Sequence, residues 1–329
     1  MSLRAVPIEA EDSLPARNPG FDLDLGWLRQ IRMNRTALER RAATIGTRRT
    51  VKKQWQAAWL LRAITLIDLT TLNSDDTPGR VERLCAKARR PVRQDILVAL
   101  GAEKLRIVPA AVCVYHAFVA SAVAALKGSG IPVAAVSTGF PSGLMPLKTR
   151  LAEIEASVRA GAEEIDIVIE RHQVLNADWK ALYGEVKAFR AACGDAHMKT
   201  IVGSGDLATL NNVARASLVC MQAGADFIKT STGKEKVNAT LPVSLAMVRM
   251  IRWFHDETGI EIGYKPAGGI ASAKDALTYL ALMKDELGTD WLTPPLFRFG
   301  ASSLLTDIER QLEHNATGRY AADYRMPMA

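Results

Sequence analysis

From about Trp55 to residue 314, short apolar runs rich in β-branched residues alternate with longer amphipathic segments. Short apolar runs are typical of buried strands, and apolar residues recurring every three to four positions are typical of helices. The pattern predicts eight strands, at 64–69, 111–115, 132–137, 164–169, 198–202, 226–230, 261–265 and 297–300. It predicts helices between them, including 81–88, 147–160, 178–192, 207–223, 241–255 and 273–287. Each helix is long enough to connect parallel strands, so we expect a parallel sheet that is buried on both faces.

Eight strand–helix units over about 260 residues match the (β/α)8 TIM barrel, an α/β fold of that typical size. A doubly wound open sheet is the alternative. In a barrel, functional side chains gather where several strands end, at one mouth. Asp68, Asp166, Lys229 and Lys265 each interrupt an apolar run near the end of their own strand. This distribution favours the barrel.

The first part of the chain differs from this repeating pattern. It contains Pro7, Pro15 and Pro19, followed by helical stretches from about Trp27 and over 36–48. Residues 1–53 hold 11 Lys and Arg against 6 Asp and Glu, and so carry five of the seven excess positive charges. We expect a basic, partly helical N-terminal extension at 1–54, a barrel domain at 55–314 and a C-terminal tail at 315–329. A basic arm is also suited to binding RNA or a partner protein, which gives an alternative function.

The composition indicates a globular chain in a reducing compartment. The hydrophobic fraction of 48% supports a large core, and the four cysteines lie far apart without a CxxC pair, which argues against disulfides and thiolate zinc sites. No leader pattern is evident, so we expect a cytoplasmic location. The uncharged stretch 107–126 is long enough to span a membrane. Its Pro109, Tyr115 and His116 favour a buried strand followed by a helix, with no membrane partner.

Two lysines lie near the ends of consecutive predicted strands, Lys229 in DFIKTSTGK and Lys265 in GYKPAGG. If these strands are neighbours, about 4.8 Å apart, two inward lysines at similar height bring their ammonium groups close together. Repulsion and desolvation then lower the pKa of one amine, and a neutral amine forms Schiff bases with carbonyls. Asp166 is placed to move protons through water. A structural salt bridge inside the barrel is the alternative role for each of these charges.

Glycines follow the sixth, seventh and eighth predicted strands, each before a helix. Loops after the late strands of barrels commonly bind phosphate with backbone N–H groups at a helix N-terminus. The predicted phosphate-binding residues are Gly233, Lys234, Gly268, Gly269, Ser302 and Ser303. Such glycines could also serve only to turn the chain.

Cofactor motifs are poorly supported. Residues 203–208 satisfy a dinucleotide-binding pattern, but the strand after them ends in lysine where an acidic residue is expected. Gly233 and Lys234 resemble the end of a Walker A motif, but Ile228 replaces its first glycine. The five histidines form no i, i+4 pair and no cluster with cysteine, so we expect them on the surface or in loops. The prediction is no cofactor and no metal.

Six blocks of this chain resemble the deoxyribose-phosphate aldolase family, which are class I aldolases: 67–72, 111–115, 164–168, 226–234, 263–269 and 299–303. The runs FIKTSTGK and KPAGG, in this order, are the most specific. The resemblance implies metal-independent, reversible cleavage of 2-deoxy-D-ribose 5-phosphate to D-glyceraldehyde 3-phosphate and acetaldehyde, in deoxyribonucleotide catabolism. It implies that Lys229 is the Schiff-base lysine, Lys265 the lysine that perturbs it and Asp166 the proton relay. Asp68 resembles a supporting member of the relay.

The flanking segments 50–61 and 317–322 resemble the longer, animal-like branch of this family. Assembly into a homo-oligomer is a possible partnership of the chain with its own copies. Two positions depart from the family pattern. His116 follows Tyr115 of the second predicted strand, at a position where other family members commonly carry proline. Gly203 stands where other members carry glutamate or alanine, and the missing side chain predicts a roomier mouth of the barrel. A Schiff-base aldolase acting on another sugar phosphate is the nearest alternative function.

Overall fold

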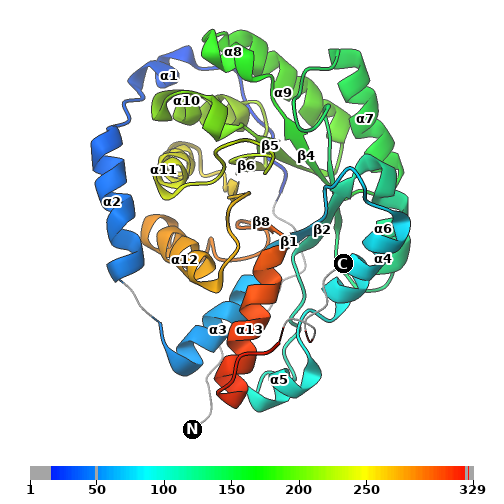
Figure 1. Cartoon of the computed structure of the whole chain (residues 1–329). Coiled ribbons are helices and arrows are strands. Elements are labelled where there is room, and N and C mark those ends of the chain that lie inside the picture. Colours follow the sequence, from blue (N-terminus) through cyan, green and yellow to red (C-terminus); the bar gives the residue numbers. More distant parts are fainter. Residues whose placement is uncertain (1–15, 49–50, 323–324, 326–329) are drawn as a thin grey trace.

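Eight parallel strands form a barrel in the computed structural model, which describes residues 16–48, 51–322 and 325 (Figure 1). The strands are β1 (Ile67–Thr70), β2 (Ala111–Tyr115), β3 (Val133–Val136), β4 (Glu164–Val168), β5 (His197–Ile201), β6 (Phe227–Lys229), β7 (Gly263–Lys265) and β8 (Phe299–Ala301). They pair in the order β7-β6-β5-β4-β3-β2-β1-β8. Isolated parallel bridges, Tyr264 to Phe297 and Ala267 to Gly300, join the two ends of this order. The predicted TIM barrel is confirmed, and the open sheet is wrong.

A ring of helices surrounds the strands. The helices that follow the eight strands and return the chain are α4 (Pro78–Arg89), α6 (Val119–Leu126), α7 (Leu147–Arg159), α9 (Trp179–Cys193), α10 (Leu210–Gln222), α11 (Leu241–Thr258), α12 (Ala273–Leu287) and α13 (Ser303–Thr317). Short helices α5 (Gln94–Ala99) and α8 (Arg171–Leu175) lie in connections, and α3 (Lys53–Ile64) precedes β1. Thr, Ser or Asp side chains cap several N-termini; Ser272 and Asp275 form a full capping box on α12.

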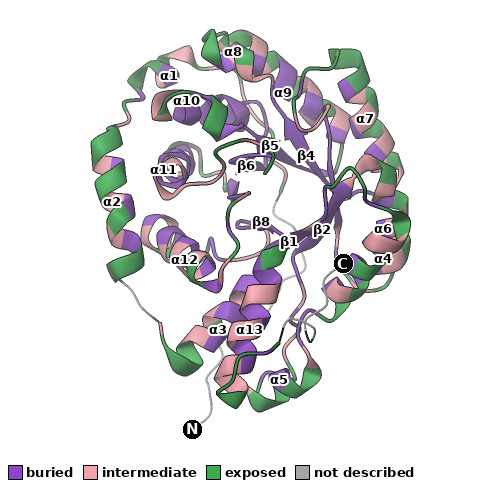
Figure 2. Cartoon of the chain, viewed as in Figure 1, coloured by how far each residue is buried: buried purple, intermediate pink, exposed green. Residues whose placement is uncertain are grey.

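The described part of the basic extension packs against the barrel wall. It forms α1 (Leu25–Gln30) and α2 (Arg35–Arg48), which contact α10, α11 and α12. The two helices bury four large aliphatic side chains at or beside their inner faces: Leu28, Ile31, Leu38 and Ile45. Figure 2 shows the corresponding mixture of buried and exposed positions along α2. Arg41 pairs with Asp285 and Glu286 of α12. Residues 16–48 are therefore part of the shell, whereas residues 1–15 lie outside the described part.

The core has two parts. A large one fills the space between strands and helices, and a small one lies on β1, β2 and β3, where Leu72, Ala111, Cys113, Ala134 and Val136 pack together. The uncharged stretch 107–126 contains β2, a 3-10 turn and α6, which agrees with the predicted buried strand and helix. Among the described helices, none has the length and apolarity needed to cross a bilayer.

Candidate active site

Asp166, Lys229 and Lys265 meet inside the barrel. Lys229 and Lys265 are the last residues of β6 and β7 and face each other in the strand register, as the sequence predicts. Both lysine Nζ atoms lie 2.7 Å from the same carboxylate oxygen, Oδ2 of Asp166 on β4. All three side chains are almost completely buried, with Lys229 3% exposed. The alternation of side chains along a strand brings these polar groups inward, whereas their apolar neighbours face the helices.

Asp68 on β1 lies on the other side of Lys265. Its Oδ2 accepts a hydrogen bond from Lys265 Nζ at 2.5 Å, and its Oδ1 accepts one from Arg298 Nη1 at 2.6 Å. Lys265 thus bridges Asp68 and Asp166, two carboxylates that the chain separates by almost one hundred residues. All four charged residues singled out in the sequence occupy one cluster.

Three further members of this cluster are not among the residues predicted from the sequence. Lys199, in the middle of β5, donates to Glu164 and, at 3.1 Å, to Oδ1 of Asp166. Arg298, just before β8, donates to Glu164 Oε1 at 2.7 Å. Lys199 interrupts the apolar strand sequence just as Lys229 does, so that signal was present. Glu164 and Arg298 lie at the beginning or edge of strands, where a charge normally reaches solvent.

The charges of this buried cluster determine which amine can be neutral. Its three carboxylates are Asp68, Glu164 and Asp166, and three of its cations make two or more short contacts with them: Lys199, Lys265 and Arg298. These six charges balance. Among the described residues, Lys229 forms an ion pair with Asp166 alone, so a protonated Lys229 would leave the buried cluster with one net positive charge. A neutral Lys229 amine restores the balance.

The pKa shifts of Lys229, Lys265 and Asp166 agree with this charge balance. Burial lowers the pKa of Lys229; the Asp166 carboxylate opposes this shift, and the charge of Lys265 adds to it. Burial would also lower the pKa of Lys265, but Asp166 and Asp68 outweigh it and raise that pKa. Burial would raise the pKa of Asp166, yet Lys199, Lys229 and Lys265 hold it well below its ordinary value. Lys265 therefore remains an ammonium and Asp166 a carboxylate, while Lys229 is the amine that loses its proton most readily.

Small apolar side chains of β2 and β3 supply an uncharged wall in the barrel interior. Cys113 is fully buried among Ala111, Ala134 and Val136. Burial raises the pKa of the Cys113 thiol, which keeps it protonated. Cys113 is thus a packed small residue in the free protein.

The predicted phosphate-binding residues come from the loops after β6, β7 and β8. Gly233, Gly268 and Gly269 have φ between +77° and +84°, which glycine adopts readily. A Cβ added to Gly233 would lie 4.0 Å from the Gly268 Cα, so these two loops are neighbours. Lys234, Ser302 and Ser303 are exposed, and Ser302 and Ser303 lie at the N-terminus of α13. The arrangement leaves backbone and side-chain donors available to an anion.

Two expectations from the sequence are wrong. Gly203 does not leave an empty space, because the Arg171 side chain lies where a Cβ of residue 203 would be. His197 is not on the surface: it begins β5, is 1% exposed and lies against Phe227 with ring centroids 6.3 Å apart. A strand that starts inside the barrel buries its first residue whatever its polarity. His116, by contrast, is partly exposed and contacts Ser157 on α7 through its Nδ1.

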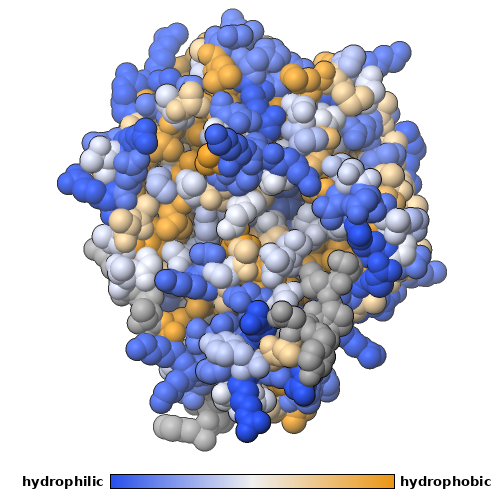
Figure 3. Space-filling view, in the orientation of Figure 1, coloured by the Kyte–Doolittle hydropathy of each residue, from blue (hydrophilic) through white to orange (hydrophobic). Residues whose placement is uncertain are grey.

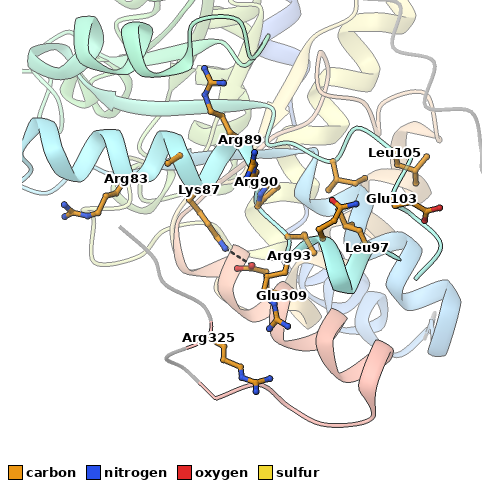
Figure 4. A pocket seen from close by; sticks show the side chains of 15 residues that line it. Arg83, Lys87, Arg89, Arg90, Arg93, Leu97, Glu103, Leu105, Glu309 and Arg325 are labelled. Atoms are coloured by element: carbon orange, nitrogen blue, oxygen red, sulfur yellow. Dashed lines mark hydrogen bonds and ion pairs between the residues drawn. The ribbon is translucent and has the colours of Figure 1, made fainter. Parts of the chain in front are cut away.

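A cavity of about 990 Å³ lies elsewhere, between α4, α5 and α13 (Figure 4). Arg83, Arg90 and Arg93 line it, together with the Lys87–Glu309 ion pair at 2.6 Å. None of the seven charged residues of the barrel cluster contributes to its wall. The cavity is therefore separate from the candidate active site at the strand ends. The face seen in Figure 3 is mainly hydrophilic, with small apolar groups scattered across it.

Comparisons with known proteins agree with this geometry. A family model described as the DeoC/LacD family aldolase matches residues 62–308. The deoxyribose-phosphate aldolases of Homo sapiens and Mus musculus are 58% and 59% identical to this chain; the matches cover 96% and 94% of it, and 100% and 98% of those proteins. The chain belongs to the deoxyribose-phosphate aldolase family. It lies in the animal-like branch, as its flanks predict, and is an enzyme of the carbon–carbon lyase class.

Solved structures show the same fold in this aldolase family. A crystal structure from Toxoplasma gondii, of a protein described as a candidate deoxyribose-phosphate aldolase, has a TM-score of 0.67 and 22% identity, covering 82% of this chain and 99% of that one. The deoxyribose phosphate aldolase of Aeropyrum pernix, described as tetrameric, has a TM-score of 0.58 and 21% identity, covering 85% and 99%. At these identities the structural likeness supports the barrel alone.

Proposed function

We propose that this family member reversibly cleaves 2-deoxy-D-ribose 5-phosphate to D-glyceraldehyde 3-phosphate and acetaldehyde, with Lys229 as the Schiff-base lysine. The observation that carries the proposal is the buried amine of Lys229, whose pKa is lowered while the neighbouring lysines are fully paired. The close relatives named for this reaction favour it over another sugar phosphate. Helices α1 and α2 pack against the barrel, which favours this reaction over the alternative that a basic arm binds RNA or a partner protein.

In this mechanism the neutral Lys229 Nζ attacks C1 of the open-chain sugar, and loss of water gives a protonated iminium. Removal of the C3 hydroxyl proton breaks the C2–C3 bond, releases glyceraldehyde 3-phosphate and sends the bonding electrons into the iminium to form an enamine. Protonation at C2 and hydrolysis then release acetaldehyde and restore the amine. The chain's own iminium accepts the electrons, so the mechanism requires neither metal nor cofactor.

Asp166, Lys265 and a water molecule carry the protons in these steps. The carboxylate of Asp166 is ionised and within 2.7 Å of Lys229, which suits it to accept a proton through water. Lys265 holds Asp166 in place and keeps an ammonium beside Lys229. Asp68 orients Lys265 from the opposite side.

The substrate phosphate would bind to Gly233, Lys234, Gly268, Gly269, Ser302 and Ser303. A dianion there would be held by backbone N–H groups, the Lys234 ammonium and the N-terminus of α13. Binding of the phosphate group, which is remote from the reacting carbon, fixes the position of C1 against Lys229. Phosphorylated sugar and aldehydes are the proposed small-molecule partners; a cytoplasmic location, a role in deoxyribonucleotide catabolism and a homo-oligomeric state also remain predictions.

Borohydride trapping tests the proposed nucleophile. Incubation with acetaldehyde and borohydride should convert one lysine to N-ethyl-lysine, and peptide mass analysis should find it at Lys229. Lys265 is the internal control, because it lies equally close to Asp166 but remains cationic. The Lys229→Met variant should lose the adduct and the cleavage activity. An adduct on Lys265, or on surface lysines alone, would contradict the mechanism.

A further inference from the structure

Arg171 connects four loops around the mouth of the barrel. It is the first residue of α8, two positions beyond the buried Ile169 that follows β4, and its side chain is only 15% exposed. Its Nη1 donates to the carbonyl oxygens of Pro141 and Ser142, in the loop after β3, at 3.3 and 3.2 Å. Its Nε lies 3.2 Å from the Asp206 carboxylate after β5. Its Nη2 donates to Glu235 Oε1 after β6 at 2.7 Å.

Glu235 links this arginine to the loop that contains Gly233 and Lys234, defined here as the phosphate loop, residues 231–235. Glu235 Oε2 accepts hydrogen bonds from the Thr232 backbone N–H at 2.9 Å and from the Thr232 hydroxyl at 2.6 Å. Thr232 Oγ1 in turn accepts the Lys234 backbone N–H at 3.1 Å. The conformation of the phosphate loop therefore depends on a carboxylate that Arg171 holds from outside the loop.

The charge of Arg171 matters as much as its contacts. Burial would raise the pKa of Glu235, but hydrogen bonds from Thr232 and Arg171 lower it, so this carboxylate is ionised. An unpaired carboxylate two residues from Gly233 would repel a bound phosphate dianion. The guanidinium neutralises it through a short charge-assisted hydrogen bond.

The absence of a side chain at Gly203 makes room for this arginine. A Cβ built on Gly203 would collide with Nε of Arg171, and the next nearest atoms are also those of the Arg171 guanidinium and its stem. Gly203 has φ +66°, in the left-handed region where glycine is favoured. The glycine that departs from the family pattern is therefore coupled to Arg171.

We infer that Arg171 is a positioning residue for substrate phosphate recognition, acting through Glu235 on the phosphate loop in a space that Gly203 leaves open. The inference rests on the proposed function, because it takes residues 231–235 as the phosphate site. It assigns Arg171 no contact with the substrate or with Lys229. Loss of Arg171 should consequently weaken binding of the phosphate group and leave the chemistry at the reacting carbon unchanged.

Kinetics with two sugars that differ only in the phosphate test this inference. For Arg171→Met, we expect KM for 2-deoxy-D-ribose 5-phosphate to rise at least tenfold with kcat within twofold of the parent value. The kcat/KM for unphosphorylated 2-deoxy-D-ribose should stay within twofold. Inorganic phosphate should inhibit the parent enzyme competitively and the variant at least tenfold more weakly. Arg171→Lys can retain the Glu235 contact, so its KM and its inhibition by phosphate should lie between those of the parent enzyme and Arg171→Met.

Arg80→Met is the matched control. Arg80 also pairs with two carboxylates after a strand, Asp75 and Asp76, but neither belongs to the phosphate loop. The Arg80→Met variant should leave the kinetic constants for both sugars and the inhibition by phosphate unchanged. Equal losses for the two sugars in Arg171→Met, or equal effects of the two variants, would overturn the inference. An inactive parent enzyme would instead refute the proposed function, so the two failures are distinguishable.

A double-mutant cycle tests the link to Gly203. Gly203→Ala alone should displace Arg171 and raise KM for the phosphorylated sugar in the same selective way. Added to Arg171→Met, it should raise KM no further, because the side chain that it displaces is already gone. Thermal unfolding of each variant identifies any loss of fold. Independent, multiplicative effects on KM would show that Gly203 does not act through Arg171.

Discussion

A single oxygen, Oδ2 of Asp166, receives hydrogen bonds from two lysines that differ in their surroundings. Lys265 also contacts a second carboxylate, Asp68, whereas Lys229 pairs with Asp166 alone within the part of the chain that the structure describes. Repulsion between the amines contributes to the lowered pKa of Lys229, but burial is the larger cause. The reactivity of one lysine thus depends on where the counterions are placed and not only on its distance from another lysine.

The pH dependence of Schiff-base trapping should report this balance. Neutral Lys229 reacts, so trapping should rise with pH to a plateau whose midpoint lies below the ordinary lysine value of about 10.4. Asp166→Asn should move the midpoint to lower pH, because the Asp166 carboxylate raises the pKa of Lys229. Lys265→Met should move it to higher pH, because a neighbouring positive charge is lost. Mass analysis of N-ethylated Lys229 against pH measures the midpoint; identical midpoints in all three proteins would contradict the assigned causes.

The site was predictable from the sequence where a charge interrupts an apolar run near the end of a strand, as Asp68, Asp166, Lys229 and Lys265 do. Glu164 and Arg298 give no such signal, because their places in the sequence are also compatible with exposure. The balance of three carboxylates against three paired cations depends on distances between strands. It could be recognised only once the barrel had brought together residues from β1, β4, β5, β6 and β7 with Arg298, which precedes β8.

At the scale of elements, the hydrophobic pattern located every barrel strand but not all of the ends. The strand predicted from residue 64 begins at Ile67, because Ile64 ends α3 and the apolar run continues from helix into strand. Fully buried helix ends and fully buried strands have the same composition, so periodicity cannot separate them. Where a capping residue and an amphipathic repeat coincide, as at Ser272, the predicted helix 273–287 matches α12.

The packing of α2 makes a prediction about the basic extension. Leu38 is 2% exposed on α2, which contacts α11 and α12. Leu38→Ala should lower the free energy of unfolding by about 2–5 kcal/mol, because it leaves a cavity in this contact. Urea denaturation measures the loss. Leu175→Ala, at a leucine that is 51% exposed, is the control and should change stability by less than about 0.5 kcal/mol. Equal stability of the two variants would indicate that α2 is a detachable arm.

At the scale of the whole molecule, the charged cluster connects five of the eight strands and Arg298, the residue before β8, so the site and the stability of the barrel are coupled. Lys199 on β5 contributes to this coupling through its hydrogen bonds to Glu164 and Asp166. Replacing it with Met leaves three buried carboxylates with two paired cations. We expect Lys199→Met to lower the free energy of unfolding at pH 7 by about 3–5 kcal/mol, the usual cost of removing one partner of a buried pair. Lys187→Met, at an exposed lysine near Tyr183, should leave stability unchanged.

The pH dependence distinguishes lost ion pairs from lost packing in Lys199→Met. The folded-state pKa values of Asp68, Glu164 and Asp166 lie below their ordinary values, because nearby cations outweigh burial. Their stabilisation is therefore complete above about pH 5, where the unfolded carboxyls are also ionised, and is lost progressively as the pH falls toward the folded values. Without the Lys199 charge those folded-state pKa values rise toward the unfolded ones, so the variant should lose less stability than the parent as the pH falls, and the two stability curves should converge at low pH. Urea denaturation between pH 7 and pH 3 should show this convergence; parallel stability curves for variant and parent would mean that Lys199 acts by packing alone.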